Sequence, residues 1–200
     1  MKLIDMKVGE YLEELRSGSP APGGGSVSAL AGAQAMALTC MVCNLTIGSP
    51  KYAESAELCR EALQEAEALY REFAEAFDRD TEAFYLVADA YKLPKSTEEE
   101  KAARSAAIAA GTVEATKVPF GVMQLSLRGL ELLAKLQGRT NVNAESDIKV
   151  AALGLHAAVT GAWYNVSINL PGIKDEALRR SYDENAREIL TRSQSLLPTP

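Results

Sequence analysis

Two long stretches of this chain carry no charged side chain. Residues 17–50 and 150–173, which are 34 and 24 residues long, contain no Asp, Glu, Lys or Arg. About 18 consecutive apolar residues would suffice to cross a membrane, but Pro20, Pro22 and the glycines at 23–25 interrupt the first stretch. Both stretches also contain Asn, Ser and Thr within their helical parts. We therefore predict two helices buried inside a protein rather than membrane spans.

The composition describes one ordinary domain. The 200 residues are 47% hydrophobic and 24% charged, which is enough chain to bury roughly 70% of the unfolded surface. No repeat or linker divides the chain, so we predict a single domain over residues 1–200. The net charge of −6 comes without any block of Lys and Arg, which argues against a nucleic-acid-binding or membrane-binding surface. The first charge-free stretch begins too late for a signal peptide, so we expect a cytoplasmic protein.

The cysteines predict neither a disulfide framework nor a metal site. Three cysteines cannot all pair within one chain, which fits a reducing compartment. Cys40 and Cys43 form a C-x-x-C inside the apolar stretch, without the βαβ context of a redox motif, so packing is the preferred interpretation. A zinc site would need four suitably spaced ligands, and only Cys59 and His156 remain to complete it.

The aliphatic residues predict an all-α fold. The chain has 32 Ala and 24 Leu against 11 Val and 7 Ile, a strong bias toward helix formers over strand formers. Capping residues, Gly and Pro then divide the chain, and we expect a single up-and-down-like bundle of about eight helices. The expected helices cover residues 5–16, 26–47, 51–91, 97–138, 147–167 and 175–195. The expected caps are Ser26 for the second helix, the capping box Thr97–Glu100 for the fourth, Ser146 or Asn143 for the fifth, and Asp175 for the last. We also expect a bend near residues 78–80, and a kink or restart at Pro119.

A glycine-rich segment precedes the first long helix. Gly23, Gly24, Gly25 and Ser26 present backbone N–H groups at a helix start, where unpaired amides and the helix dipole favour phosphate or carboxylate. The alternative is a flexible loop that lets two helices meet. The chain has neither the P-loop nor the dinucleotide-binding glycine pattern, so a nucleotide site has no support.

Small and polar residues share one face of the second charge-free helix. Asp147, Gly154, Gly161 and Asn165 lie on this face, because they recur at helical spacing together with Ala151 and Ala158. The 18 positions from Asp147 to Asn165 span about 27 Å, too far for both to touch one reacting centre. They therefore serve the two ends of a long ligand, different copies of a site built across subunits, or packing alone.

Two titratable residues of this region are candidates for proton transfer. Asp147 opens a buried helix, so it is either an anion stabilised by the helix dipole or a general base with a raised pKa. His156, the only histidine, lies half a turn away from that face. It is either a core residue with satisfied hydrogen bonds or a catalyst.

Several motifs, in order along nearly the whole chain, resemble one family. They are Pro20–Ser26 before an Ala-rich helix that ends at Asn44–Gly48, Ala90–Lys95 followed by Thr97, Glu100 and Lys101, Asn143–Asp147, and Asn165–Leu170. Together they resemble the formimidoyltetrahydrofolate cyclodeaminase and methenyltetrahydrofolate cyclohydrolase family, which in animals forms the C-terminal half of formimidoyltransferase-cyclodeaminase. Cys40 and Cys43 depart from the smaller residues expected in the Ala-rich helix.

The resemblance implies an all-helical homodimer that acts on tetrahydrofolate derivatives without metal, nucleotide or other cofactor. On this basis Asp147 would transfer protons or bind the amino edge of the pterin, and His156 is a second candidate for proton transfer. Asn165 and Asn169 would bind the pterin edge, since amides both donate and accept. The amides of Gly23 to Ser26, with Lys92 or Lys95, would hold the carboxylates of the glutamate tail. Asn143 joins this set of substrate-binding residues through its motif.

The expected function is formimidoyltetrahydrofolate cyclodeaminase, which closes 5-formimidoyltetrahydrofolate to 5,10-methenyltetrahydrofolate and releases ammonia. Methenyltetrahydrofolate cyclohydrolase, which adds water to the methenyl carbon to give 10-formyltetrahydrofolate, is the enzymatic alternative. A non-catalytic helical module, which binds folate or only a protein partner, is the alternative of another class. A cyclodeaminase would depend on a separate formimidoyltransferase for its substrate.

Overall fold

The computed structural model describes residues 2–198, and these residues form helices and no strand. The helices are η1 (Leu3–Asp5), α1 (Val8–Leu15), α2 (Gly24–Ile47), η2 (Pro50–Ser55), α3 (Ala56–Lys92), α4 (Glu98–Leu136), η3 (Val142–Ala144), α5 (Glu145–Asn169), η4 (Leu170–Gly172) and α6 (Glu176–Ser195), where η denotes a 3₁₀ helix. The all-α prediction is confirmed. The described chain has six α-helices rather than about eight, because two predicted interruptions of long helices do not occur.

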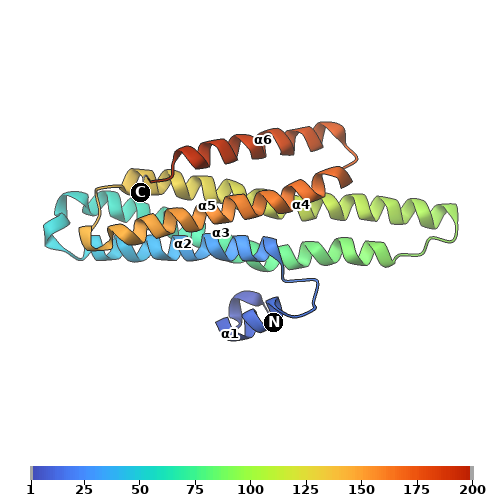
Figure 1. The fold of residues 1–200 in the computed structure, drawn as a ribbon, viewed down its shortest axis with the longest axis horizontal. Coiled ribbons are helices and arrows are strands. Elements are labelled where there is room, and N and C mark those ends of the chain that lie inside the picture. Colours follow the sequence, from blue (N-terminus) through green and yellow to red (C-terminus); the bar gives the residue numbers. More distant parts are fainter. Residues whose placement is uncertain (1, 199–200) are drawn as a thin grey trace.

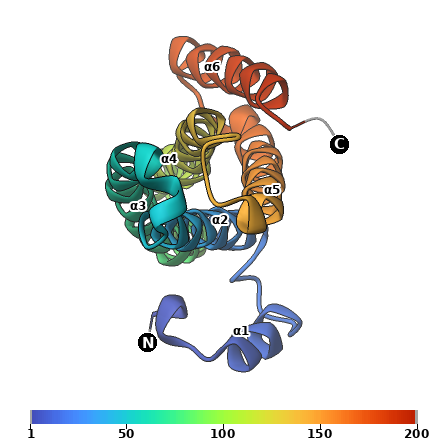
Figure 2. The same ribbon diagram turned by 90° about the vertical axis from the view of Figure 1, so that its left-hand side faces the viewer.

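Four helices form the core of the molecule. α2, α3, α4 and α5 run alternately up and down, and each packs against the next around a ring that α5 closes onto α2 (Figure 2). α6 lies outside this ring across α4 and α5, and α1 lies on the opposite side (Figures 1 and 2). The ring of Tyr11 in α1 packs edge-on against Phe77 of α3, with centroids 5.1 Å apart. The predicted up-and-down arrangement is therefore present.

The long helices α3 and α4 are continuous. α3 shows no break near residues 78–80, and Pro119 lies inside α4. A proline removes one helical hydrogen bond and clashes with the preceding turn, so α4 forms in spite of its local preference. Pro119 is buried between the helices that pack against α4, and this tertiary packing overrides the cost.

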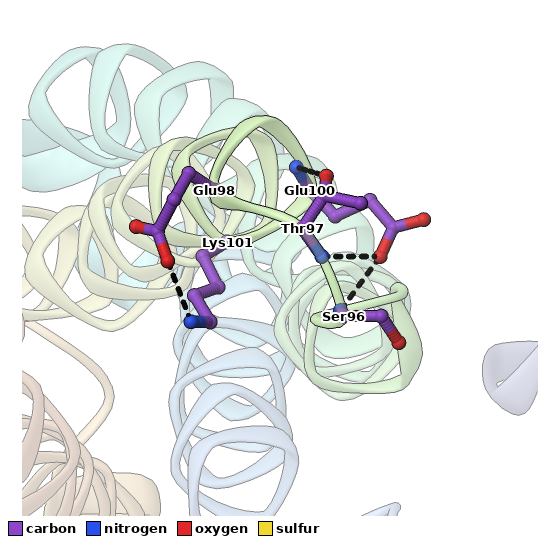
Figure 3. Close-up of polar contacts among 5 residues, drawn as sticks. All are labelled: Ser96, Thr97, Glu98, Glu100 and Lys101. Atoms are coloured by element: carbon purple, nitrogen blue, oxygen red, sulfur yellow. Dashed lines mark hydrogen bonds and ion pairs between the residues drawn. The ribbon is translucent and has the colours of Figure 1, made fainter.

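Two of the predicted helix caps are present and two are wrong. The Thr97 hydroxyl accepts from the Glu100 amide in a capping box at the tip of the α3–α4 hairpin (Figure 3). Asp175 caps α6 through the Leu178 amide, at 3.0 Å. Ser26 is not an N-cap, because α2 already begins at Gly24 with Gly23 as its N-cap.

α5 likewise begins earlier than its predicted caps. Its N-cap is Ala144, which has no side-chain acceptor, so neither Ser146 nor Asn143 fills this role. The side chain of Asn141 instead accepts from the Asn143 amide and opens the short helix η3. This turn carries the chain directly into α5 at Glu145.

The two charge-free stretches form α2 and α5, which pack antiparallel through small residues. A β-carbon on Gly154 would lie 3.3 Å from that of Ala35, and one on Gly161 would overlap the Ser28 hydroxyl. α2 is long and apolar enough to cross a membrane, with a mean hydropathy of 1.5. In this structure it is a core helix of the bundle, with α3, α4 and α5 against it.

The α3–α4 hairpin extends beyond the ring of four helices. α2 begins and α5 ends well before the hairpin turn, so the last turns of α3 and the first turns of α4 project from one end of the bundle (Figure 1). The site described next lies at the base of this projection.

Candidate functional site

A cavity of about 380 Å³ lies where α2 begins, α5 ends and the hairpin continues. Its walls come from segments far apart in the sequence: the loop before α2, the start of α2, the middle of α3 and α4, and the end of α5. The lining residues are Pro20, Ala21, Gly23, Gly24, Gly25, Asp80, Phe84, Val87, Ala115, Asn165, Ile168 and Asn169. The cavity therefore unites the predicted glycine segment with the predicted amides Asn165 and Asn169.

Asp80 is the acid of this cavity. It follows Leu69, Phe73 and Ala76 along the inner face of α3, where the other three side chains are buried. Its Oδ2 accepts hydrogen bonds from the backbone N–H of Ser26 at 2.9 Å and from the Ser26 hydroxyl at 3.1 Å. The first turn of α2 therefore holds the carboxylate in one orientation, at the positive end of the helix dipole.

Gly25 is required at its position because Asp80 lies against it. A β-carbon on Gly25 would overlap the Asp80 carboxylate. Gly24 is similarly close to Asn165, with the Asn165 Nδ2 3.3 Å from the place of a β-carbon. The glycines thus let an acid and an amide approach the α2 backbone. The Ser26 amide, predicted to hold a substrate carboxylate, already donates to Asp80.

Burial raises the pKa of Asp80. Loss of water around the carboxylate is the larger effect, and the two hydrogen bonds from Ser26, which favour the charged form, offset it only in part. A carboxyl group with a raised pKa, held in a cavity, is better suited to accept and return a proton than an exposed one.

Two amides face the same cavity from the end of α5. The Nδ2 group of Asn165 donates to the Gly161 carbonyl at 2.9 Å, and that of Asn169 donates to the Ala115 carbonyl at 3.0 Å. These bonds orient both amide planes. Within residues 2–198 neither amide has a further hydrogen-bond partner, so each keeps an N–H and an oxygen for a ligand.

The structure does not bring the other predicted site residues to this cavity. Asp147 is half-buried in the first turn of α5, about 27 Å from Asn165 along the helix. His156 is about 13 Å from Asn165 along α5, and its buried Nδ1 has no partner within the described chain. Asn143 is exposed in η3.

The two predicted lysines lie on the projecting hairpin. Lys92 is exposed, about 18 Å beyond Asp80 along α3. Its ammonium pairs with Asp89 at 2.8 Å, and this pairing raises the pKa of Lys92. Lys95 is exposed in the turn that follows. Neither residue lines the cavity.

Asp80 is the residue that sequence reasoning missed. It was assigned only to a predicted bend in the helix, although it continues the row of Leu69, Phe73 and Ala76 at steps of three and four. An acid in register with buried apolar residues was the available signal. Nothing in the local sequence showed that the start of α2 would meet it, because Ser26 and Asp80 are 54 residues apart.

Comparisons with known proteins identify the family of this chain. A family model described as formiminotransferase-cyclodeaminase matches residues 7–188. The chain belongs to this family. A methenyltetrahydrofolate cyclohydrolase of Methylorubrum extorquens is 38% identical over 90% of this chain and 85% of its own length. A crystal structure of a formiminotetrahydrofolate cyclodeaminase from Thermotoga maritima superposes with a TM-score of 0.85 at 29% identity, covering 96% of this chain and 92% of that one.

The animal members of the family are longer. The formimidoyltransferase-cyclodeaminase of Gallus gallus is 33% identical over 94% of this chain, which spans 35% of the chicken protein. The relatives therefore include chains of similar length and longer proteins of which only one part matches this chain.

Proposed function

We propose that this chain is a folate one-carbon enzyme, a formimidoyltetrahydrofolate cyclodeaminase, with Asp80 as the proton-transfer residue. The observation that carries the proposal is a carboxyl group of raised pKa in a cavity that two oriented amides also face. Membership of the family supplies the substrate class. The assignment to Asp80 replaces the expectation for Asp147 and His156, which line no part of this cavity.

The reaction needs a single proton to move between two nitrogens. In protonated 5-formimidoyltetrahydrofolate, nitrogen 10 attacks the formimidoyl carbon, and a tetrahedral carbon forms with the positive charge on nitrogen 10. Asp80 accepts the proton from nitrogen 10 and returns it to the amino group on that carbon. The carbon–nitrogen bond then breaks, ammonia leaves, and the positive charge remains on the 5,10-methenyl product. One carboxylate suffices, because the proton that it takes is the proton that it gives.

Positioning supplies the rest of the catalysis. Nitrogen 10 and the formimidoyl carbon belong to one molecule, so holding the two in contact removes most of the entropic cost of their reaction. We assign the pterin edge to Asn165 and Asn169, whose free amide groups match its alternating donors and acceptors. Phe84 and Val87 provide an apolar wall for the benzoyl ring. The chemistry requires no metal or other cofactor.

Methenyltetrahydrofolate cyclohydrolase is the second candidate. A relative with this name favours it. The protein from Methylorubrum extorquens is 38% identical to this chain, and the match covers 85% of its length. At the same cavity Asp80 would accept a proton from water as the water attacks the methenyl carbon. It would then give that proton to nitrogen 5 as the bond from carbon to nitrogen 5 breaks, while the remaining hydroxyl proton passes to solvent and 10-formyltetrahydrofolate forms.

The purified chain should be given 5-formimidoyltetrahydrofolate and 5,10-methenyltetrahydrofolate in separate assays, with methenyl absorbance as the signal. Growth of the signal with the first substrate supports the cyclodeaminase, and accelerated loss with the second supports the cyclohydrolase. Binding without turnover of either would identify a non-catalytic folate-binding module. Absence of both binding and turnover would overturn the folate assignment.

We also propose that the enzyme is a cytoplasmic homodimer that depends on a separate formimidoyltransferase for its substrate. Support for the dimer comes from the outer face of α2 and α5, called here the α2–α5 face. It consists of exposed apolar residues: Val27, Met41, Leu45, Val150, Leu153, Tyr164 and Ile168. Successive members are 14 and 4 positions apart on α2 and 3, 11 and 4 positions apart on α5, spacings that keep them on one face of each helix, and the two helices pack antiparallel. A second copy would cover this face without burying any charge.

A further inference from the structure

We propose that Arg104 binds a carboxylate of the folate glutamate tail, beside a row of α3 side chains that continues from the Asp80 cavity toward the tip of the α3–α4 hairpin. The inference rests on the proposed function for its substrate, and it places the tail on a residue outside the predicted motifs. Three observations support it: a row of side chains, an arginine without an acidic partner, and a matching length.

The row runs along the inner side of the hairpin. Asp80, Phe84, Val87 and Tyr91 recur on α3 at steps of four, three and four, so they share one face of that helix. α2 and α5 cover this face at Asp80 and end before Tyr91. Beyond the cavity the row is therefore open, and 37% of Phe84 and 57% of Tyr91 are exposed. These aromatic side chains form an apolar floor that leads away from Asp80.

α4 supplies the other side of this floor. Ala115, which lines the cavity, and Arg104 are eleven positions apart, which is close to three turns and places both on the same face of α4. The Arg104 guanidinium lies 5.3 Å from the centre of the Tyr91 ring. The row on α3 and the row on α4 thus meet at the Tyr91–Arg104 pair.

The guanidinium of Arg104 has N–H groups that remain available to a ligand. Its Nε and Nη2 donate to the Tyr91 carbonyl at 3.2 and 3.1 Å, which ties the side chain to the end of α3. Between residues 2 and 198 no carboxylate lies within ion-pair distance of this guanidinium, whereas Lys92 pairs with Asp89. Lys101 pairs with Glu98 (Figure 3). Arg104 is also half-buried, so its charge is less hydrated than that of an exposed lysine. A guanidinium held in this way is suited to bind a carboxylate.

The length of the row on α3 fits the substrate. The eleven steps from Asp80 to Tyr91 span about 16 Å along α3. Bond lengths like those of a peptide place the two carboxylates of the first glutamate roughly 10–13 Å from nitrogen 10. With the reacting carbon at Asp80, these carboxylates lie about one helical turn before Tyr91, within reach of the long Arg104 side chain. The benzoyl ring then lies over Phe84 and Val87.

The test compares substrates with and without the glutamate. Arg104→Gln should be assayed with 5-formimidoyltetrahydrofolate and with the corresponding formimidoyltetrahydropteroate, which ends at the benzoate. If the wild type acts as the cyclohydrolase, the two substrates are 5,10-methenyltetrahydrofolate and the corresponding methenyltetrahydropteroate. Loss of a charge-assisted bond to a carboxylate should raise KM for the glutamate-bearing substrate by roughly 10- to 100-fold with kcat within twofold. KM for the pteroate should not change.

Two controls separate this role from a structural one. Arg128→Ala removes an arginine of the same helix that pairs with Glu72 instead, and it should leave KM unchanged for both substrates. Arg104→Lys keeps the charge but not the planar fork, so it should restore part of the affinity for the glutamate-bearing substrate only. An equal rise of KM for both substrates, or no rise for either, would overturn the proposal.

Binding provides a second readout that does not need turnover. Calorimetry with tetrahydrofolate and tetrahydropteroate should show a higher affinity of the wild type for the glutamate-bearing compound, and Arg104→Gln should abolish the difference. A wild type that shows this difference without catalysing either reaction would refute the proposed enzyme and support the subsite. A wild type that turns over both substrates with equal KM would support the proposed enzyme and refute the Arg104 subsite.

Discussion

A carboxylate inside a helical bundle is costly unless hydrogen bonds favour it. For Asp80 the cost is only partly offset, since its pKa remains raised in spite of two bonds from Ser26. Such a residue destabilises the fold at neutral pH while it provides a base of useful strength. Two predictions follow from this balance, one for the carboxylate and one for the hydroxyl that contacts it.

Asp80→Asn should abolish most of the turnover and raise the stability at neutral pH. An amide cannot transfer the proton, so we expect kcat to fall by roughly 10²- to 10⁴-fold. The folded protein binds the Asp80 proton more tightly than the unfolded chain, so the ionised side chain costs stability above its raised pKa. Thermal unfolding at pH 7–8 should therefore occur at a higher temperature in the variant. This gain should shrink as the pH falls through the raised pKa and vanish below the ordinary value of 3.8.

For this variant, a normal fold with wild-type turnover would remove Asp80 from the mechanism. Asp147→Asn is the matched control, since that acid lies about 27 Å away along α5 and should be dispensable for the chemical step in this subunit. A large loss of kcat in Asp147→Asn alone would return the catalytic role to that residue.

Ser26→Ala should move the acid side of the pH–rate profile. The hydroxyl donates to the Asp80 Oδ2 at 3.1 Å and favours the ionised form. Without it the pKa of Asp80 rises further, so activity that needs the carboxylate should begin to fall at a higher pH than in the wild type. Ser126→Ala, which removes a buried hydroxyl bonded within α4, should leave the profile in place. A shift toward lower pH in Ser26→Ala would contradict the proposed role of the hydroxyl.

At the scale of the helices, close approach of α2 and α5 determines where the cavity lies. Gly24, Ser28 and Ala35 face Asn165, Gly161 and Gly154 in antiparallel register. Larger residues at these positions would separate the helices, and the amides of α5 would then move away from Asp80. The small residues therefore serve packing, and this packing brings the polar groups of the cavity together.

Gly161→Ala tests this packing. The added β-carbon overlaps the Ser28 hydroxyl, so we expect a loss of about 1–3 kcal/mol in the free energy of unfolding. Removing the hydroxyl in Gly161→Ala/Ser28→Ala should recover part of the loss, since the two substitutions act on one contact. Gly121→Ala, at a helical position with open space, should be neutral or stabilising by up to about 1 kcal/mol. Denaturant titration of the wild type, these three variants and Ser28→Ala gives these differences, and strictly additive effects of Gly161→Ala and Ser28→Ala would refute the contact.

At the scale of the whole molecule, the α2–α5 face is unusually free of charge for a surface exposed to water. The 24 residues of α2 make it about 36 Å long, and two helices give it an area of roughly 700 Å². Each partner of a standard interface contributes about 800 Å². An apolar face of this size on a soluble chain indicates a binding surface, and its lack of charge is the reason for proposing a second copy as its partner.

Leu153→Glu should convert the proposed dimer into a monomer. Leu153 is 60% exposed on the α2–α5 face, so the substitution leaves the core of one subunit intact but would bury a charge in the interface. Sedimentation velocity should show a halved mass for Leu153→Glu and an unchanged mass for Leu86→Glu, which alters an exposed leucine on the hairpin. A wild type that sediments as a monomer at micromolar concentration would refute the dimer.

Much of this architecture was predictable because its causes are local. The excess of Ala and Leu over Val and Ile predicts helices, and the capping box at Thr97 and the cap at Asp175 lie where the sequence places them. No helix ends near residues 78–80 or restarts at Pro119, because packing against neighbouring helices overrides the local preference for a break. The prediction also fails at Ser26, whose side chain contacts an acid 54 residues away instead of capping its own helix.

The sequence by itself determined that the chain is all helical, that two long stretches of it carry no charge, and that Gly23–Ser26, Asn165 and Asn169 belong to candidate site motifs. Only the tertiary structure decided which of these motifs meet. It joined the start of α2 to the end of α5 around Asp80 and left Asp147 at the other end of its helix. The physical reason is that spacing along a chain determines the face of a helix on which a residue lies. Which residues of different helices touch depends on how the helices pack, and here that packing depends on the close approach allowed by Gly24, Gly25 and Gly161.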